Sequence, residues 1–418
     1  MCETRSVENI EAMTLLVVYH LRSASSQGVW YMIGLAMRTA IDLGLHRKAN
    51  EIHLDPITAQ MRRRLFWTVY YLERVVSMSL GRPFSIADRH IDLPLPLDID
   101  DDIKDPTQLT SIPPPDRLTT LTFAIHLIQL RRIDSKIQHK IYRADRPLHT
   151  LRPKMDELYL ELEDWKNAAL RRFTAPQDLD YPLLHYNRAL RLLIQPFLPS
   201  LPLSDPYYHV CLRAAGTVCQ THKRLHQTLE YGHSFLAVQT VFISGITLLY
   251  ALWTHAAHVW SVQMSNDIRA CSTVLFVMGE RASWVKKYRD AFELLVNAAM
   301  EKLDAATSTT TTTTTTTGAA TTNGPASDPA KKPSMTELMM ATSSSSTTTT
   351  AEPSAPALSS MNVDPNSQDH GVRMAFELAP WIDLAEEDAP FWMPDFQTLE
   401  SLSGGFFGGG DTAPFDAL

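Results

Sequence analysis

One run of the sequence, from Met61 to Phe84, reads MRRRLFWTVYYLERVVSMSLGRPF and has the pattern of a single long helix. The helix should end at Gly81 and Pro83, because glycine adopts the left-handed backbone of a helix end and proline cannot continue a helix. Apolar residues recur every three or four positions and therefore share one face of the helix: they are Leu65, Val69, Leu72 and Val76, flanked by Phe66 and Tyr70.

Three consecutive arginines, Arg62–Arg64, open this helix. A cationic first turn gains nothing from the helix dipole. We therefore interpret the arginines as a solvated helix start with carboxylate partners elsewhere in the fold. Arg63 and Arg74 lie on the same face as Trp67, which would allow a cation–π contact. Direct contact with DNA is the less favoured alternative, since no basic or aromatic continuation surrounds the arginines.

The preceding run, Gly34–Arg47, reads GLAMRTAIDLGLHR and carries a second pattern. Together the two runs resemble the middle regulatory region of fungal transcription factors with a Zn₂Cys₆ binuclear cluster. That family has roughly Ala-x-Arg-x-Ala-x-x-Leu-Gly-Leu-His, then Arg-Arg-Arg-x-x-Trp, and Leu-Gly-Arg-Pro at the end of the helix. The matching positions are Ala36, Arg38, Ala40, Leu43, Gly44, Leu45, His46, Arg62, Arg63, Arg64, Trp67, Leu80, Gly81, Arg82 and Pro83.

The resemblance covers roughly residues 3–303 and implies an all-α regulatory domain. Members of the family carry a six-cysteine cluster that binds two zinc ions, are nuclear, and act on promoters, commonly as dimers. We expect this chain to be truncated, with no cofactor of its own and zinc only in the missing N-terminal cluster. The expected partners are transcriptional coactivators, a second copy or a related factor, a small-molecule effector, and promoter DNA only through the missing head. No membrane is expected.

Composition agrees with a helical protein whose charge is unevenly distributed. The chain has 418 residues, enough to bury a large core, and glycine is scarce. Its net charge is −8, but the segment Met374–Leu418 alone holds nine acids and neither lysine nor arginine. The remainder is therefore nearly neutral, which gives no electrostatic reason for it to bind nucleic acid by itself.

The sequence divides into three parts. Residues 1–304 form the regulatory domain, 305–373 a Thr/Ser-rich disordered linker with little to bury, and 374–418 an acidic-aromatic segment. The helices expected in the first part are Ser6–Arg22, Val29–Leu45, Asp55–Leu80, Arg117–Ala144, Leu151–Phe173, Tyr181–Leu198, Tyr207–Tyr231, Phe235–Val262 and Asn266–Leu303.

The acidic-aromatic segment is interpreted as a transcriptional activation segment. Its acids keep the aromatic groups in water, and a cluster of such groups can fold as a short helix into a coactivator groove. The apolar residues proposed to make that contact are Trp381, Phe391, Trp392, Phe396, Leu399 and Leu402. The alternative is a tail that only increases solubility, but such a tail does not need so many aromatic residues.

Several other features favour ordinary structural roles. The uncharged stretch Phe235–Trp253 is long enough to span a bilayer, but its polar residues favour a buried core helix. The Asp-rich loop 98–102 lacks the glycine and glutamate of a calcium loop, which favours a solvated loop. His222 and His226 lack the neighbouring glutamate of a zinc hydrolase site. The cysteines Cys2, Cys211, Cys219 and Cys271 form no metal-binding pairs and are expected to be reduced and buried.

The sequence therefore predicts a nuclear fungal transcription regulator, namely the regulatory part of a Zn₂Cys₆-type factor that controls RNA polymerase II genes. The alternative is a helical interaction protein that acts in trans on full-length factors without binding DNA itself. An enzyme is not expected, because no phosphate loop, nucleophile elbow or dinucleotide turn is present. An all-α terpene cyclase would need Asp-rich motifs on helices, whereas Asp98–Asp102 lies in a loop flanked by prolines.

Overall fold

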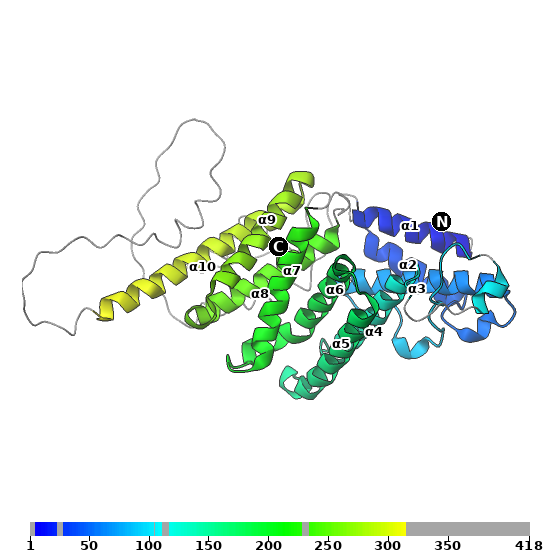
Figure 1. The fold of residues 1–418 in the computed structure, drawn as a ribbon, viewed down its shortest axis with the longest axis horizontal. Helices are drawn as coiled ribbons and strands as arrows, with labels where there is room; N and C mark the ends of the chain where they lie inside the picture. Colours follow the sequence, from blue (N-terminus) through cyan, green and yellow to red (C-terminus); the bar gives the residue numbers. More distant parts are fainter. Residues whose placement is uncertain (1–4, 23–27, 104, 111–116, 228–233, 315–418) are drawn as a thin grey trace, which may run out of the picture.

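The computed structural model describes residues 5–22, 28–103, 105–110, 117–227 and 234–314 (Figure 1). Throughout this part of the chain the regular structure is helical, which confirms the predicted all-α class. The α-helices are α1 (Val7–Arg22), α2 (Val29–Asp42), α3 (Pro56–Ser79), α4 (Thr122–Lys140), α5 (Arg152–Arg172), α6 (Pro176–Ile194), α7 (Pro206–Leu225), α8 (Phe235–Val259), α9 (Val262–Arg281) and α10 (Val285–Thr314). Short 3₁₀ helices lie between them: η1 (Lys48–Glu51), η2 (Asp88–His90), η3 (Pro106–Thr110), η4 (Leu148–Leu151) and η5 (Gln195–Ser200).

The helices follow one another along the long axis of the molecule. In Figure 1, α1–α3 lie at one end, α4–α6 in the middle and α7–α10 at the other end. Neighbours in sequence pack as antiparallel neighbours in space, most extensively α6 with α7, α7 with α8 and α1 with α2. Such local packing follows from short connections between amphipathic helices.

Two apolar clusters hold the helices together. The N-terminal cluster joins α1, α2 and α3 and also includes Ile128 of α4 and Phe235 of α8. The C-terminal cluster runs from α4 to α10. The clusters meet where the ring of Phe235 approaches that of Trp284, with centroids 5.9 Å apart, and where the Gln239 side-chain amide donates to the Ser79 carbonyl. The two ends of the molecule are therefore joined through α8.

Local sequence explains where several helices begin. Asp55 precedes α3, and its carboxylate accepts a hydrogen bond from the Thr58 amide at 3.0 Å. Ser234 and Ser261 cap α8 and α9 in the same way, through the amides of Ala237 and Met264. These side chains satisfy amides that have no partner within the helix.

Helix α8 occupies the core, as predicted for the uncharged stretch. It is long and apolar enough to cross a membrane by length and composition, but 83% of its most apolar window is buried against other helices. Its polar groups are also satisfied, since the Ser244 hydroxyl donates to the Thr240 carbonyl at 2.7 Å and Thr247 donates to Ile243 at 2.8 Å. Packing within the protein therefore accounts for its apolar sequence.

The predicted single helix Asn266–Leu303 is wrong, because the structure has two helices there. Ala282 adopts an extended backbone, with φ −141° and ψ 115°, and ends α9. The chain then turns through Ser283 and Trp284, so that α10 folds back against both α9 and α8. No glycine or proline marks residues 282–284, so the sequence pattern carried no sign of the break. The turn is favoured because it buries the apolar faces of both helices.

Several helix boundaries also differ from expectation, and α4 (Thr122–Lys140) is shorter at both ends than the expected Arg117–Ala144. Helix α6 begins at Pro176 rather than at Tyr181, since proline fits the first turn of a helix, where its missing amide costs nothing. Helix α10 continues to Thr314, beyond the expected end at Leu303 and into the start of the predicted linker. Extending an existing helix needs no new nucleus, so Ala305, Ala306 and the first threonines can continue it.

The other expectations for the C-terminal part lie outside the described residues. They comprise the remainder of the linker 305–373, the segment 374–418, and the apolar residues Trp381, Phe391, Trp392, Phe396, Leu399 and Leu402.

Candidate regulatory site

The two motif glycines end α2 and α3 in the same way. Gly44 and Gly81 have φ values of +70° and +63°, which favour glycine. The amide of Gly44 donates to the Ile41 carbonyl and that of Leu45 to the Ala40 carbonyl, both at 2.9 Å. These are the paired hydrogen bonds of a Schellman ending.

After α3 the equivalent bonds run from the Gly81 amide to the Met78 carbonyl and from the Arg82 amide to the Ser77 carbonyl. The glycines therefore fix the direction in which the chain leaves each helix.

The other residues of the α2 motif face the packed interior or cover it. Leu45 is buried in the N-terminal cluster. The Arg38 side chain folds back along α2 and covers Gly34. Its guanidinium lies 3.1 Å from the position that a Cβ atom on Gly34 would occupy. His46 is half-buried, and this burial lowers the pKa of its imidazole. These contacts give the motif residues structural roles.

Trp67 and Arg82 anchor the segment that follows α3. The Trp67 indole N–H donates to the Pro94 carbonyl at 2.9 Å, which holds residues 91–95 against the helix. The Arg82 guanidinium lies over the ring of Trp30 at 4.4 Å and thereby connects the end of α3 to α2. Pro83 itself is exposed.

The expectation that Arg62–Arg64 form a solvated first turn is wrong, because α3 begins at Pro56 and the side chains of Arg63 and Arg64 are mostly buried. The three arginines have acidic residues nearby. Arg63 forms a bidentate ion pair with Glu51, in which Nε donates to Oε1 and Nη2 donates to Oε2, both at 2.6 Å. Arg64 pairs with Asp101 at 2.9 Å. Hydrogen bonds from the backbone and from Ser6 lower the pKa of the Glu8 carboxyl on α1, and the charge of Arg62 adds to this effect. The predicted carboxylate partners are thus present for Arg63 and Arg64, which pin η1 and the Asp-rich loop to α3.

The predicted cation–π contact on Trp67 is wrong, because the aromatic partners of Arg74 are different rings. Its guanidinium lies 4.3 Å from the ring centre of Tyr70 and 4.2 Å from that of Phe84. Arg63 is instead engaged by Glu51. The error has a simple cause: helical spacing showed that the side chains share a face, but not that residues 84–86 fold back over it.

A buried ionic network lies beneath these motifs. Arg74 and Glu73 are fully buried and paired with each other, and Arg74 also donates to the Ile86 carbonyl at 2.6 Å. Glu73 accepts a hydrogen bond from the Ser85 amide at 2.7 Å.

Asp88 extends the network by accepting from the Tyr70 hydroxyl at 2.6 Å and from Ser135 of α4. Burial raises the pKa of Tyr70 well above its usual value, so it remains a neutral donor. We call Tyr70, Glu73, Arg74, Ser85 and Asp88 the α3 clamp. It holds residues 85–88 on α3 and reaches α4.

The Asp-rich loop is more tightly bound than a solvated loop. Asp98 accepts hydrogen bonds from the hydroxyls of Thr119 and Thr122 and contacts Arg172 at 3.1 Å. Asp100 pairs with Arg117 at 2.6 Å. The acids thus connect the loop to the start of α4 and the end of α5. Among the described residues, no group of three or more His, Cys, Asp and Glu side chains is placed so that it could hold a metal ion.

A second buried charged cluster escaped the sequence analysis. Arg131 and Asp134 of α4 pair at 2.6 Å, with side chains 1% and 0% exposed. Arg188 of α6 approaches the same carboxylate at 3.5 Å, and Arg191 lies one turn further along α6. We call these four residues the α4–α6 arginine cluster. The sequence spacing was a signal for each half of the cluster. Arg131 and Asp134, and likewise Arg188 and Arg191, are three residues apart and so lie on one face of their helix.

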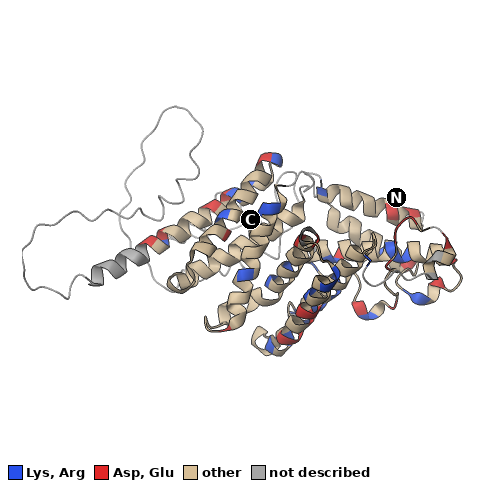
Figure 2. Cartoon of the chain, viewed as in Figure 1, with Lys and Arg blue, Asp and Glu red and all other residues tan. Residues whose placement is uncertain are grey.

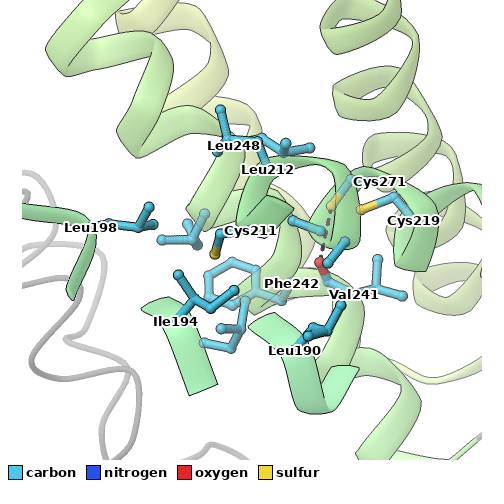
Figure 3. Close-up of a cluster of buried hydrophobic side chains, with 14 of the residues drawn as sticks. Leu190, Ile194, Leu198, Cys211, Leu212, Cys219, Val241, Phe242, Leu248 and Cys271 are labelled. Carbon is cyan, nitrogen blue, oxygen red and sulfur yellow. Dashed lines mark hydrogen bonds between the residues drawn. The ribbon is translucent and has the colours of Figure 1, made fainter. Parts of the chain in front are cut away.

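The histidines and cysteines singled out in the sequence have core positions. Burial lowers the pKa of His222 to about 3 and raises that of the Cys211 thiol to about 12. Figure 3 shows Cys211, Cys219 and Cys271 among apolar side chains, with the Cys271 thiol directed at the Val241 carbonyl, 3.5 Å away. All three described cysteines are free and buried, as expected from their spacing.

The charges of the described helices are mixed in sign. In Figure 2, basic and acidic segments alternate along α5 and around the Asp-rich loop, while much of α7–α9 is uncharged. Many of the charges are paired, as in Lys136 with Glu161 and Lys140 with Glu157. Along the described helices, basic and acidic residues are therefore interspersed rather than separated into different elements.

The N-terminal helices match a recognised family model. Residues 2–167 match the family model described as the fungal specific transcription factor domain. The match covers α1–α4 and most of α5, and it includes the α3 clamp and the motif residues. This part of the chain is therefore similar to the fungal specific transcription factor domain.

Comparison of the whole chain with known proteins also finds similarity to a transcriptional regulator. The chain is 30% identical over 71% of its length to an uncharacterized transcriptional regulatory protein of Saccharomyces cerevisiae. It is 29% identical over 59% of its length to pyrimidine pathway regulatory protein 1 of the same yeast. A positive regulator of purine utilization from Emericella nidulans is 26% identical over 71% of the chain.

The chain spans 24%, 29% and 36% of the lengths of these three relatives. No solved structure matches it.

Proposed function

We propose that this chain is the regulatory part of a fungal transcription regulator of the Zn₂Cys₆ type that controls RNA polymerase II genes. The observation that carries the proposal is the fungal specific transcription factor domain at residues 2–167. Relatives named as transcriptional regulators, which match well beyond that domain, support it. They favour this function over that of a helical protein acting only in trans, and over an enzyme.

Promoter DNA, in this proposal, is bound through a zinc cluster outside residues 1–418, and zinc is bound only there. The support is indirect. The described helices carry mixed charge, and their cysteines are buried in the core. The relatives are also far longer than the region they share with this chain. The regulator would work in the nucleus, as a homodimer or with a related factor.

Residues 374–418 would recruit transcriptional coactivators, with Trp381, Phe391, Trp392, Phe396, Leu399 and Leu402 as the contacting side chains. The support is compositional: nine acids alternate with aromatic and aliphatic residues in this segment. Acids keep such residues in water until a groove in a partner accepts them. The helical body would regulate the segment in response to a small-molecule effector.

A reporter assay tests this function. The whole chain, the chain without residues 374–418, and residues 374–418 alone are each fused to a foreign DNA-binding domain. We expect the isolated segment to activate the reporter and the chain lacking it to lose activation. The matched control is the same segment with Phe391 and Trp392 changed to alanine, which keeps the charge but removes two apolar contacts. If well-expressed segment and whole-chain fusions are both silent, activation by this chain is refuted.

A further inference from the structure

The α4–α6 arginine cluster contains more positive than negative charge. Among the described residues, Asp134 is the acid that contacts Arg131 and Arg188, at 2.6 and 3.5 Å. Arg191 is 6% exposed, and its side chain is hydrogen-bonded to the neutral Gln195. Arg131 and Arg188 therefore share one carboxylate, while the charge of Arg191, which acts on Arg188, adds a third guanidinium without a carboxylate of its own. A buried charge without a counter-charge is costly, so such a cluster favours an additional anion.

The neighbouring titratable groups do not supply that anion. Arg131 faces the neutral ring of Tyr71 on α3, at 5.6 Å, and the imidazole of His185 on α6. Burial and the nearby arginines keep the pKa of His185 well below its usual value, so the imidazole is neutral. Burial also lowers the pKa of Arg188 to about 10, which still leaves it charged at neutral pH. On α7, His222 is neutral for the same reason as His185.

Hydrogen-bonding groups in the cluster lack partners as well. The Nε atoms of Arg131 and Arg191 are buried and have no hydrogen-bond partner in the part of the chain that the structure describes. The Oδ1 atom of Asp134 is in the same condition. The Nη1 atom of Arg131, although 2.6 Å from Asp134, also lacks a hydrogen bond, so three donors and one acceptor remain to be satisfied. A ligand that suits these groups is an anion that also carries a hydroxyl or another hydrogen-bond donor.

The cluster is placed where a ligand could influence the rest of the domain. Ser135, next to Asp134 on α4, donates to Asp88 of the α3 clamp. Arg131 reaches the ring of Tyr71 on α3. A ligand between α4 and α6 would therefore change the contacts that α4 makes with the N-terminal helices. Because the groups are buried, a ligand reaches them only when these helices move apart, which couples binding to conformation.

We propose that Arg131, Arg188 and Arg191, together with Asp134, bind a small carboxylate- or phosphate-bearing metabolite that also carries a hydrogen-bond donor. This inference rests on the proposed function, because it assigns the effector of the regulator to a place in the fold. The anion neutralises the surplus charge and accepts from the two Nε atoms, while its donor reaches Asp134.

The test measures thermal unfolding of the full chain, titrated separately with L-malate and with inorganic phosphate, with sodium chloride at equal ionic strength as reference. We expect a saturable rise in the midpoint of unfolding with at least one of the two anions. Malate alone would identify a carboxylate ligand and phosphate alone a phosphate ligand. If neither anion stabilises the chain more than chloride does, the inference is overturned.

Variants then locate the site. Arg191→Met removes one surplus charge, so we expect it to raise the midpoint in the absence of anion and to weaken anion binding about tenfold or more. Arg224→Met on α7 is the matched control, because Arg224 is an exposed partner of Asp180; it should leave anion binding unchanged.

Equal anion binding by Arg191→Met and wild type would overturn the assignment. Should Arg191→Met fail to fold, Arg191→Lys preserves the charge but not the Nε donor. We expect it to bind the anion more weakly, and unchanged binding would again overturn the site. The reporter assay keeps this inference separate from the proposed function. A chain that activates transcription but binds neither anion refutes the anion site alone.

Discussion

Glu73 and Arg74 depend on each other because both side chains are fully buried. Glu73→Gln would keep a hydrogen bond from the Ser85 amide but remove the buried carboxylate paired with Arg74, leaving it only the more distant Asp88 at 3.6 Å. Breaking a buried pair at one partner typically costs several kcal/mol, so we expect a loss of about 3 kcal/mol in the free energy of unfolding. Urea unfolding followed by circular dichroism measures this loss.

The matched control for that substitution is Asp145→Asn, which breaks the exposed pair with Arg143. Exposed pairs contribute little to stability because water screens their charges, so the control should remain close to wild type. Similar losses for the two variants would show that the α3 clamp is not a buried ionic unit.

The buried imidazole of His222 makes stability depend on pH. Burial lowers its folded-state pKa to about 3, whereas an unfolded histidine has a pKa of about 6.5. Between these values the unfolded chain binds a proton that the folded chain does not. The free energy of unfolding should therefore fall as the pH falls, by up to about 1.4 kcal/mol per pH unit for this one group. His185 acts in the same direction.

The contribution of His222 can be isolated by comparing unfolding in urea at about pH 7 and about pH 5. His222→Gln should reduce the difference in stability between the two conditions, whatever its effect at neutral pH. The control is His149→Gln, because His149 is exposed and its imidazole contacts water in both states. An unchanged pH difference in His222→Gln would contradict this explanation.

At the level of helices, the close packing of α8 against α9 and α10 depends on Gly245. A Cβ at this position would lie 2.5 Å from both the Cys271 sulfur and a ring carbon of Phe292. Alanine favours a helix over glycine by about 1 kcal/mol, but overpacking a core costs about 1–3 kcal/mol. We expect Gly245→Ala to lower the temperature of unfolding because the clash outweighs the gain in helix propensity.

Gly279 of α9 provides the comparison for that substitution. A Cβ there would meet atoms of Lys286 and Arg289 no closer than 3.7 Å, which is ordinary contact. Gly279→Ala should therefore leave the unfolding temperature unchanged or raise it. If calorimetry shows Gly245→Ala to be as stable as Gly279→Ala, the tight packing of α8 is refuted.

Most helices could be predicted because each repeats apolar residues at helical spacing and is bordered by capping residues, glycine or proline. The break between α9 and α10 could not, since it rests on long-range packing around Ala282 and Ser283. The same distinction applies to the candidate site. Its motif residues could be recognised in the sequence. The burial of Glu73 and Arg74 could not, because it depends on residues 84–88 folding back over α3. The α4–α6 arginine cluster likewise requires two distant helices to meet.

At the level of the whole molecule, the folded helical body is longer than the segment that matches the family model. The family match ends at residue 167, inside α5 (Arg152–Arg172). Met155, Leu158, Leu162 and Trp165 of α5 are buried in the C-terminal cluster, which continues to α10. A chain cut at residue 167 would expose these side chains to water. We expect it to be insoluble or to lack cooperative unfolding.

A chain ending at residue 314 keeps both clusters and is the matched comparison. It should unfold in one cooperative transition, since α8 joins the two ends through Phe235 and Gln239. Differential scanning calorimetry distinguishes the two chains. A soluble 1–167 chain with its own sharp transition would show instead that the matched domain folds independently.

The alkylation rates of Cys211, Cys219 and Cys271 measure how often the folded protein opens locally. All three cysteines are buried in the C-terminal cluster, with Cys211 beside Ile194 of α6 and Cys219 near Cys271 of α9 (Figure 3). Alkylating reagents attack thiolates that water can reach, so each of these cysteines is protected until its helix separates from the core. The rate at which iodoacetamide adds mass to these residues therefore reports how often the helical body opens under native conditions, without any label being introduced.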